Sequence, residues 1–184
     1  MARPKKTDTV RARKPETGRV ILSLGDDVST DVIYPGRYMA TVLPTETPAY
    51  AFADHAAFQA AVRAKAVPKG AVVAAGHNFG CGSSREQAAS CLKGWNVVVV
   101  ARSFARIFLQ NAINLGLRVV AAPGFAADEG DEIVIEDGCV ENRTKRTAFD
   151  IVPLPSARQA ILDAGGLVPY TRARLVAERR PAAG

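Results

Sequence analysis

The middle of the chain alternates short apolar runs with longer segments whose apolar residues have helical spacing. Three runs hold almost no polar residue and are too short for buried helices, so the pattern predicts buried strands at residues 71–76, 96–100 and 117–122. Helices are predicted between and after them at residues 84–93 and 103–116, and an earlier strand at residues 19–24. Successive strand–helix units favour parallel strands with right-handed crossovers.

The flanking segments have different patterns. Residues 48–66 are rich in alanine and predict one amphipathic helix, whose apolar face would carry Tyr50, Phe52, Phe58 and Val62. Residues 131–153 contain short apolar runs separated by turn residues, which predicts a β-rich layer beside the α/β part. Two further helices are predicted at residues 156–164 and 169–178.

Length and composition predict one domain with short tails. The chain has 184 residues with 48% hydrophobic content, which is ample for a core. We expect a basic, disordered N-terminal tail at residues 1–17, the domain at 18–178 and a C-terminal tail at 179–184. No run approaches the ~20 apolar residues of a membrane-spanning helix, and the basic start lacks the apolar segment of a signal peptide. We therefore expect a soluble, cytoplasmic protein that does not contact a membrane.

The positive charge of the chain lies mostly near its ends. The net charge is +6, and seven Lys and Arg residues precede Val20. Basic tails are usually solvated, so this charge by itself does not indicate a nucleic-acid partner, and we expect none. An RNA-binding or regulatory module stays an alternative.

Three cysteines, Cys81, Cys91 and Cys139, have neither the even count of a secreted disulfide framework nor a CxxC spacing. They indicate a reducing compartment, and their separation argues against an iron–sulfur cluster held by this chain alone. We expect no metal site and no bound cofactor in this chain.

The strongest local motif runs from Gly80 to Glu86, with the sequence GCGSSRE, between a buried strand and a helix. Glycines allow a ligand to approach the backbone, and the first N–H groups of a helix attract an anion. Two hydroxyls and Arg85 add further donors, so the motif predicts a carboxylate or phosphate pocket. A simpler interpretation makes Ser83 or Ser84 a helix N-cap. A serine hydrolase would need a histidine such as His77, but no G-x-S-x-G pattern accompanies it.

Three segments together resemble the aconitase family, namely its swivel domain and the small subunit of the isopropylmalate isomerases. They are HNFGCGSSREQA, GDDVSTDVIYPGRYM and VVVARSFARIFLQNAINLGL, and the resemblance covers residues 18–175 in the order that the family has. It implies an α/β fold, a swivelling three-layer β/β/α domain like the aconitase C-terminal domain.

The resemblance also implies an activity. Family members are hydro-lyases that move water between adjacent carbons of a hydroxy di- or tricarboxylate through an alkene. The isopropylmalate type, which serves leucine biosynthesis, is active only as a complex of this subunit with a large subunit, and the [4Fe-4S] cluster belongs to that partner. Related substrates, homoaconitate and dimethylmalate, stay open as alternatives.

Residue roles follow from the same resemblance. Ser83 matches the serine that acts as base in its alkoxide form, and Arg85 matches the arginine that binds a substrate carboxylate, with Ser84 and Gly82 beside them. Asp31 matches an active-site aspartate that pairs with groups of the large subunit. For Asp26 and Asp27 we expect turn and capping roles only.

Specificity is expected in residues 36–41. Relatives that accept an added carboxylate resemble YLRT here, whereas this chain has Ala40 in place of that arginine. A small apolar residue favours an alkyl substituent, because an unpaired carboxylate beside it would be costly. Arg37 is close enough in the sequence to reach the substrate as well, so the substrate is not decided by this loop.

Overall fold

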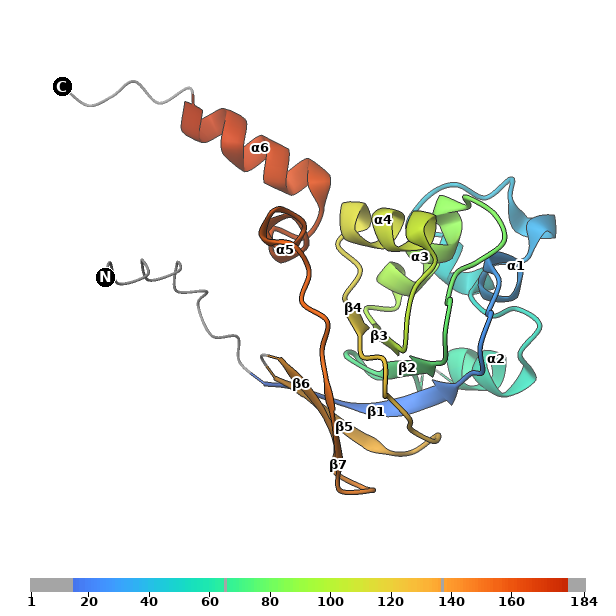
Figure 1. Ribbon diagram of the computed structural model, residues 1–184. Coiled ribbons are helices and arrows are strands. Elements are labelled where there is room, and N and C mark those ends of the chain that lie inside the picture. Colours follow the sequence, from blue (N-terminus) through green and yellow to red (C-terminus); the bar gives the residue numbers. More distant parts are fainter. Residues whose placement is uncertain (1–14, 65, 137, 179–184) are drawn as a thin grey trace, which may run out of the picture.

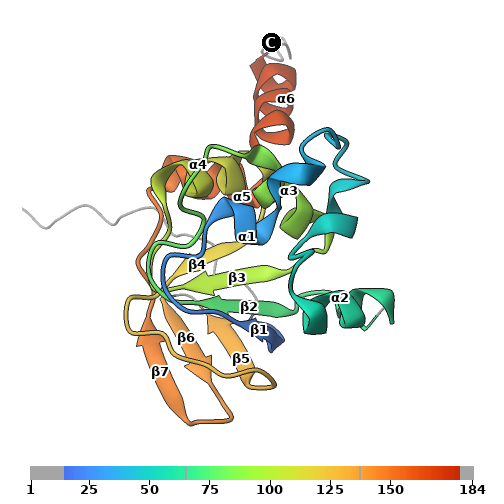
Figure 2. The same cartoon turned by 90° about the vertical axis from the view of Figure 1, so that its right-hand side faces the viewer.

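The computed structural model describes residues 15–64, 66–136 and 138–178. Helices cover one face of a twisted sheet, and a second set of strands lies against the opposite face (Figures 1 and 2). The expected three-layer α/β architecture is therefore confirmed. Of the two predicted tails, residues 1–14 and 179–184 lie outside the described residues. Residues 15–17 are described, and the first strand already begins at Glu16.

Four parallel strands form one half of the sheet. They are β1 (Glu16–Ser23), β2 (Val72–Ala75), β3 (Val98–Ala101) and β4 (Val119–Ala121). Their spatial order is β4-β3-β2-β1, and each neighbouring pair is parallel. The predicted parallel arrangement is confirmed.

Three antiparallel strands continue the sheet beyond β1. They are β5 (Glu132–Glu136), β6 (Cys139–Asn142) and β7 (Thr147–Asp150). Strand β1 belongs to both halves, because its first residues pair with β5 and its last residues pair with β2, with an irregular register between Val20 and Leu22. A bulge of this kind bends a strand and increases its twist. The two halves can therefore turn toward each other around β1.

Side-chain alternation along the parallel strands fills two separate cores. One set faces the helices and comprises Leu22, Val73, Ala75, Val99, Ala101 and Val119. The other set faces β5–β7 and comprises Val20, Val72, Ala74, Val98, Val100 and Val120. Successive side chains of a strand point to opposite faces, so strands that are apolar throughout must be covered on both sides.

The helical layer consists mainly of α1 (Thr30–Ile33), α2 (Ala56–Arg63), α3 (Glu86–Gly94) and α4 (Arg106–Leu115). Their buried residues join the first core, among them Ile33, Phe58, Leu92 and Phe108. Both predicted crossover helices are present, and each begins two or three residues later than the periodicity indicated.

The prediction of one helix over residues 48–66 is wrong in its first half. A 3-10 turn at Thr47–Tyr50 is followed by a bend, and α2 begins only at Ala56, with His55 as its N-cap. Phe52 interrupts the helix, because its φ of 47° lies in the left-handed region. Its N–H donates to the carbonyl of Ile33, and its side chain is buried. A contact distant in sequence thus overrides the local helical pattern.

The chain closes with α5 (Ser156–Asp163) and α6 (Leu167–Glu178). Helix α6 extends away from the rest of the molecule (Figures 1 and 2), and none of its residues is buried. Another 3-10 turn, Gly36–Tyr38, lies in the loop after α1. In the described residues, no helix is both long and apolar enough to cross a membrane.

Candidate active site

Two loops that are distant in the sequence lie side by side at the carboxyl ends of β1 and β2. We call residues 25–39 the aspartate loop and residues 77–85 the glycine loop. Backbone hydrogen bonds of 2.8 Å join them, from Asp27 to His77, from Gly80 to Val28 and from Thr30 to Cys81. The carboxyl edge of parallel strands is the usual place for ligands in open α/β sheets.

The glycine loop has a backbone that other residues could not adopt without strain. Gly80 and Gly82 have φ values of 83° and 95°, in the left-handed region. A Cβ on Gly80 would lie 2.2 Å from the Phe108 ring. These two glycines therefore let the loop turn sharply and pack against α4, and the exposed backbone of Gly82 stays accessible to a ligand.

Ser83 contacts the first helix of the aspartate loop. Its hydroxyl lies 2.8 Å from the hydroxyl of Thr30, and its N–H donates to the same Thr30 oxygen at 3.2 Å. Thr30 was not among the residues predicted for the site, although its position directly before Asp31 in the aspartate loop could have indicated it. The partner of the Ser83 hydroxyl is thus Thr30 and not His77, the histidine that a serine hydrolase would need.

The N-cap of α3 is Arg85, not Ser83 or Ser84, and its side chain makes no capping hydrogen bond. The predicted start of this helix at residue 84 is therefore corrected to Glu86. Ser84 is exposed, and its backbone carbonyl accepts a hydrogen bond from the side-chain amide of Asn111 in α4. The simpler interpretation of the two serines as helix caps does not describe this loop.

Arg85 joins the two loops through an ion pair with Asp31. Its Nε also lies 3.2 Å from the sulfur of Met39. The Arg85 side chain is only 16% exposed, whereas that of Asp31 is 61% exposed. The guanidinium, aided by the N–H of Gly36, lowers the pKa of the Asp31 carboxyl below its usual value. The aspartate is therefore ionised at neutral pH.

Asp26 and Asp27 were expected to have turn and capping roles, but their carboxylates bind the glycine loop instead. Asp26 accepts the backbone N–H of His77 at 2.7 Å, and Asp27 accepts the side-chain amide of Asn78 at 2.8 Å. Both carboxylates thus hold the two loops together and lie outside the group formed by Ser83, Arg85 and Asp31.

Arg37 is bound on the surface of the aspartate loop. Its guanidinium makes a two-fold contact with both oxygens of Asp54 and lies 4.7 Å from the centre of the Tyr38 ring. Tyr38 in turn stacks on Tyr50 at 4.3 Å. The structure therefore gives Arg37 a partner other than Asp31 or Ser83. Ala40 lies in the turn that follows and is exposed.

The cysteines are free thiols in separate places. Cys91 is buried in α3, where desolvation raises the pKa of its thiol, while Cys81 and Cys139 are partly exposed. Across residues 15–64, 66–136 and 138–178, no three His, Cys, Asp or Glu side chains gather as metal ligands. The described residues therefore do not fit an iron–sulfur cluster.

Comparison with known proteins decides the family. The model of the aconitase C-terminal domain matches residues 32–123, which include the whole glycine loop. The chain belongs to the aconitase C-terminal domain family. Within this family it is 46% identical to the 3-isopropylmalate dehydratase small subunit of Methanosarcina mazei, over 84% of this chain and 95% of that protein.

Further relatives agree. Small subunit 1 of the 3-isopropylmalate dehydratase of Archaeoglobus fulgidus is 43% identical, over 80% of this chain and 92% of that protein. The crystal structure of a 3-isopropylmalate dehydratase from Methanocaldococcus jannaschii superposes with a TM-score of 0.79 at 37% identity, covering 90% of this chain and 98% of that one. The family fold thus extends over nearly the whole chain.

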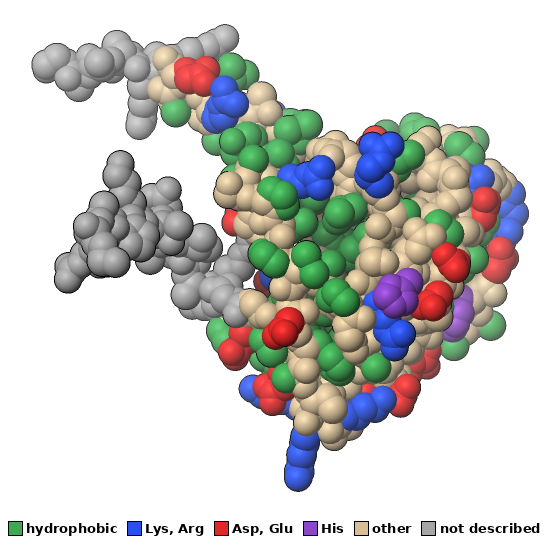
Figure 3. Space-filling model, viewed as in Figure 1, with side chains coloured by type: hydrophobic (Ala, Val, Ile, Leu, Met, Phe, Trp, Pro, Cys, Tyr) green, Lys and Arg blue, Asp and Glu red, His purple; other side chains and the backbone are tan. Residues whose placement is uncertain are grey.

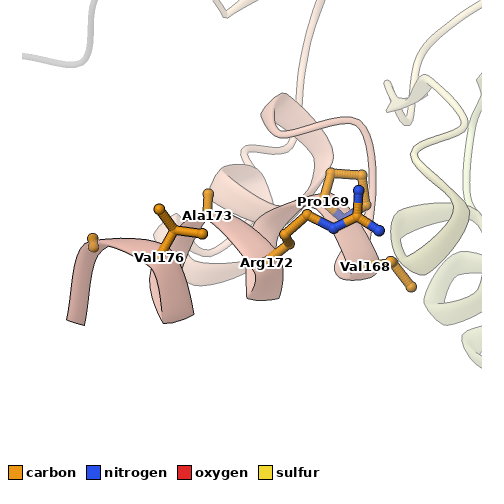
Figure 4. A pocket seen from close by; sticks show the side chains of 6 residues that line it. Val168, Pro169, Arg172, Ala173 and Val176 are labelled. Carbon is orange, nitrogen blue, oxygen red and sulfur yellow. The ribbon is translucent and has the colours of Figure 1, made fainter. Parts of the chain in front are cut away.

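Hollows of the surface also lie along α6. One is lined by Val168, Pro169, Arg172, Ala173, Val176 and Ala177 (Figure 4). Apolar side chains of this helix are exposed on the arm that it forms (Figure 3). None of the lining residues belongs to the aspartate or glycine loop, so the hollow is separate from the candidate active site.

Proposed function

We propose that this chain is the small subunit of a 3-isopropylmalate dehydratase, a hydro-lyase that interconverts 2-isopropylmalate and 3-isopropylmalate by dehydration and rehydration. The observation that carries the proposal is the meeting of Ser83, Arg85 and Asp31 at one place on two hydrogen-bonded loops. The identity of 46% to a small subunit of this enzyme supports the same substrate class. The reaction belongs to leucine biosynthesis, and we place it in the cytoplasm.

Ser83 is proposed as the base. In its anionic form it would take the proton from the carbon beside a substrate carboxylate, and the electrons of that C–H bond would form the double bond as the hydroxyl leaves the neighbouring carbon. Rehydration would return the proton from Ser83. An alkoxide needs strong stabilisation, which the loop N–H groups, the start of α3 and the Arg85 cation would supply in a closed site.

Arg85 is proposed to bind a substrate carboxylate, with the backbone of Gly82 and the hydroxyl of Ser84 beside it. A guanidinium offers two parallel donors to a carboxylate, and Arg85 already holds one carboxylate, that of Asp31. The substrate carboxylate would therefore share the Arg85 cation with Asp31 or take the place of Asp31 beside it. Asp31 is exposed enough to pair with groups of the large subunit once it is released.

The large subunit is the proposed partner and would carry the [4Fe-4S] cluster, whose Lewis acidity assists departure of the hydroxyl. Apolar side chains exposed just after Asp31 support a covering partner: Val32, Met39, Val42 and Leu43 are between 44% and 65% exposed. Apolar groups gathered in one segment commonly mark an interface. The partner would also close the site against water.

Ala40 is proposed to face the variable substituent of the substrate. An alanine leaves room for an isopropyl group and offers no donor to a further carboxylate. Arg37 was the alternative, but its guanidinium is bound to Asp54 and stacked over Tyr38. We therefore propose that Arg37 supports the loop and does not select the substrate.

Co-expression with the large subunit tests the function. The complex is purified anaerobically, its cluster is reconstituted, and turnover is compared on 3-isopropylmalate, homocitrate and dimethylmalate. We expect the highest kcat/KM on isopropylmalate, and neither turnover nor stoichiometric iron with the chain alone. Faster turnover of homocitrate or dimethylmalate would contradict isopropylmalate as the substrate. Iron retained by the isolated chain would contradict the two-subunit proposal.

A further inference from the structure

Thr30 holds a fixed position between the two loops. It is the first residue of α1 and is only 1% exposed. Its N–H donates to the carbonyl of Cys81 at 2.8 Å, and its own carbonyl accepts the N–H of Tyr34 at 2.8 Å. Its backbone is thereby tied to the glycine loop on one side and to the end of α1 on the other.

The hydroxyl of Thr30 meets Ser83 twice. It accepts the N–H of Ser83 at 3.2 Å and lies 2.8 Å from the Ser83 hydroxyl oxygen. A threonine hydroxyl has one proton to donate and two lone pairs with which to accept. Since one lone pair is used by the Ser83 N–H, the single proton is free to point at the oxygen of Ser83.

We infer that Thr30 is a positioning residue for Ser83, an inference that rests on the proposed role of Ser83 as base. When Ser83 has lost its proton, it can only accept, so the Thr30 hydroxyl must be the donor in the 2.8 Å contact. When Ser83 has regained a proton, either hydroxyl can donate. The pair therefore serves both protonation states without moving, and the bond to the anion is the stronger one.

A threonine suits this role because its side chain is stiff. The branched Cβ restricts rotation about χ1, and burial of the side chain restricts it further. The hydroxyl is consequently held toward Ser83 before the substrate binds. Such preorganisation costs no rearrangement at the moment when charge develops on Ser83.

Three variants of the reconstituted complex test the inference. Thr30→Val keeps the shape and removes the hydroxyl, and Thr30→Ser keeps the hydroxyl. The matched control is Thr47→Val, because Thr47 is also buried and its hydroxyl lies 3.1 Å from that of Ser90 on α3. Each variant is measured for kcat, KM, the pH dependence of kcat and the melting temperature, on whichever hydroxy acid the wild-type complex converts fastest.

We expect Thr30→Val to lower kcat about 10- to 100-fold, as for loss of a hydrogen bond to a charged group, with KM changed less than about threefold. The rise of kcat with pH should move to higher pH, because the Ser83 anion becomes harder to form. Thr30→Ser should restore most of kcat. Thr47→Val should lower the melting temperature and leave kcat and its pH profile unchanged.

A measurement on the isolated chain tests the geometry without turnover. The Ser83 amide donates to the Thr30 hydroxyl, so its hydrogen exchange should be slow in the wild type and in Thr30→Ser, and faster in Thr30→Val. Normal kcat in Thr30→Val together with a lowered melting temperature would overturn the inference and leave Thr30 a purely structural residue. Should Ser83→Ala also turn over normally, the proposed base itself fails. If the wild-type complex prefers a hydroxy acid other than isopropylmalate, only the proposed function is overturned.

Discussion

The Arg85 guanidinium and the Asp31 carboxylate form an ion pair across the two loops of the candidate site. The arginine is enclosed while the aspartate reaches solvent, and the arginine lowers the pKa of that carboxyl. The free subunit thus keeps this largely enclosed cation paired before any substrate is present. Leaving it unpaired would carry a desolvation cost. Substrate binding is then an exchange of carboxylates around one guanidinium.

The first prediction concerns Ser83. Ser83→Ala in the complex should reduce kcat on the order of 10²- to 10⁴-fold with little change in KM, because a base acts only as the proton leaves. Steady-state kinetics and a melting curve are the measurements. Ser156→Ala, at the start of α5, is a control that should retain full activity. Near-normal turnover by Ser83→Ala would leave the glycine loop as an anion-binding site only.

The second prediction concerns Arg85. Arg85→Lys keeps the positive charge but loses the planar pair of donors, so KM should rise more than kcat falls. The same replacement at Arg143, which pairs with Glu132 and Glu141 on the β5–β7 half of the sheet, should change neither constant. A fall in kcat at constant KM would instead assign Arg85 to the transition state alone.

The third prediction concerns specificity. Ala40→Arg should shift kcat/KM from alkyl-substituted malates toward substrates with an added carboxylate, since a guanidinium pairs with a carboxylate and is costly to desolvate beside an alkyl group. Ala49→Arg places the same side chain at another exposed position of the neighbouring 3-10 turn and should not change the ratio. Equal ratios in both variants would show that Ala40 does not face the substituent.

The fourth prediction concerns stability and pH at Asp131. This buried carboxylate accepts the Asp128 N–H and the Asn142 amide, both at 2.8 Å, and Lys145 lies 3.5 Å away. These hydrogen bonds lower its pKa. Asp131→Asn keeps one oxygen that can accept both N–H groups but removes the charge that strengthens these hydrogen bonds, so it should cost about 1–3 kcal/mol at neutral pH.

The pH dependence follows from the direction of the shift. A carboxyl with a lowered folded pKa contributes its full stabilisation above the unfolded pKa and loses it as the pH falls through the folded value. Urea unfolding should therefore show a constant difference in the free energy of unfolding between wild type and Asp131→Asn from about pH 5 to pH 8. This difference should shrink below the usual carboxyl pKa of 3.8. Asp128→Asn, with an exposed side chain paired to Lys145, should cost less than about 1 kcal/mol. An equal loss in both variants would contradict the role of burial.

Much of the fold is readable from local patterns. Residues 71–76, 96–100 and 117–122 are apolar on both strand faces, which indicated strands covered on both sides, and the structure places them between two cores. The helical spacing of apolar residues in α4 and the glycine-rich turn before α3 were likewise evident in the sequence. These features depend on residues that are near one another in the chain, so periodicity and turn chemistry suffice to find them.

Contacts between distant segments were beyond such reasoning. Only the folded chain brings Thr30 to Ser83, binds Arg37 to Asp54 and turns Phe52 into the core in place of a helix. Only the sheet register shows that β1 serves both halves. The sequence by itself determined which segments form strands and helices and which residue types could bind an anion. The tertiary structure decided which side chains meet, because those contacts depend on how the buried faces of many elements pack at once.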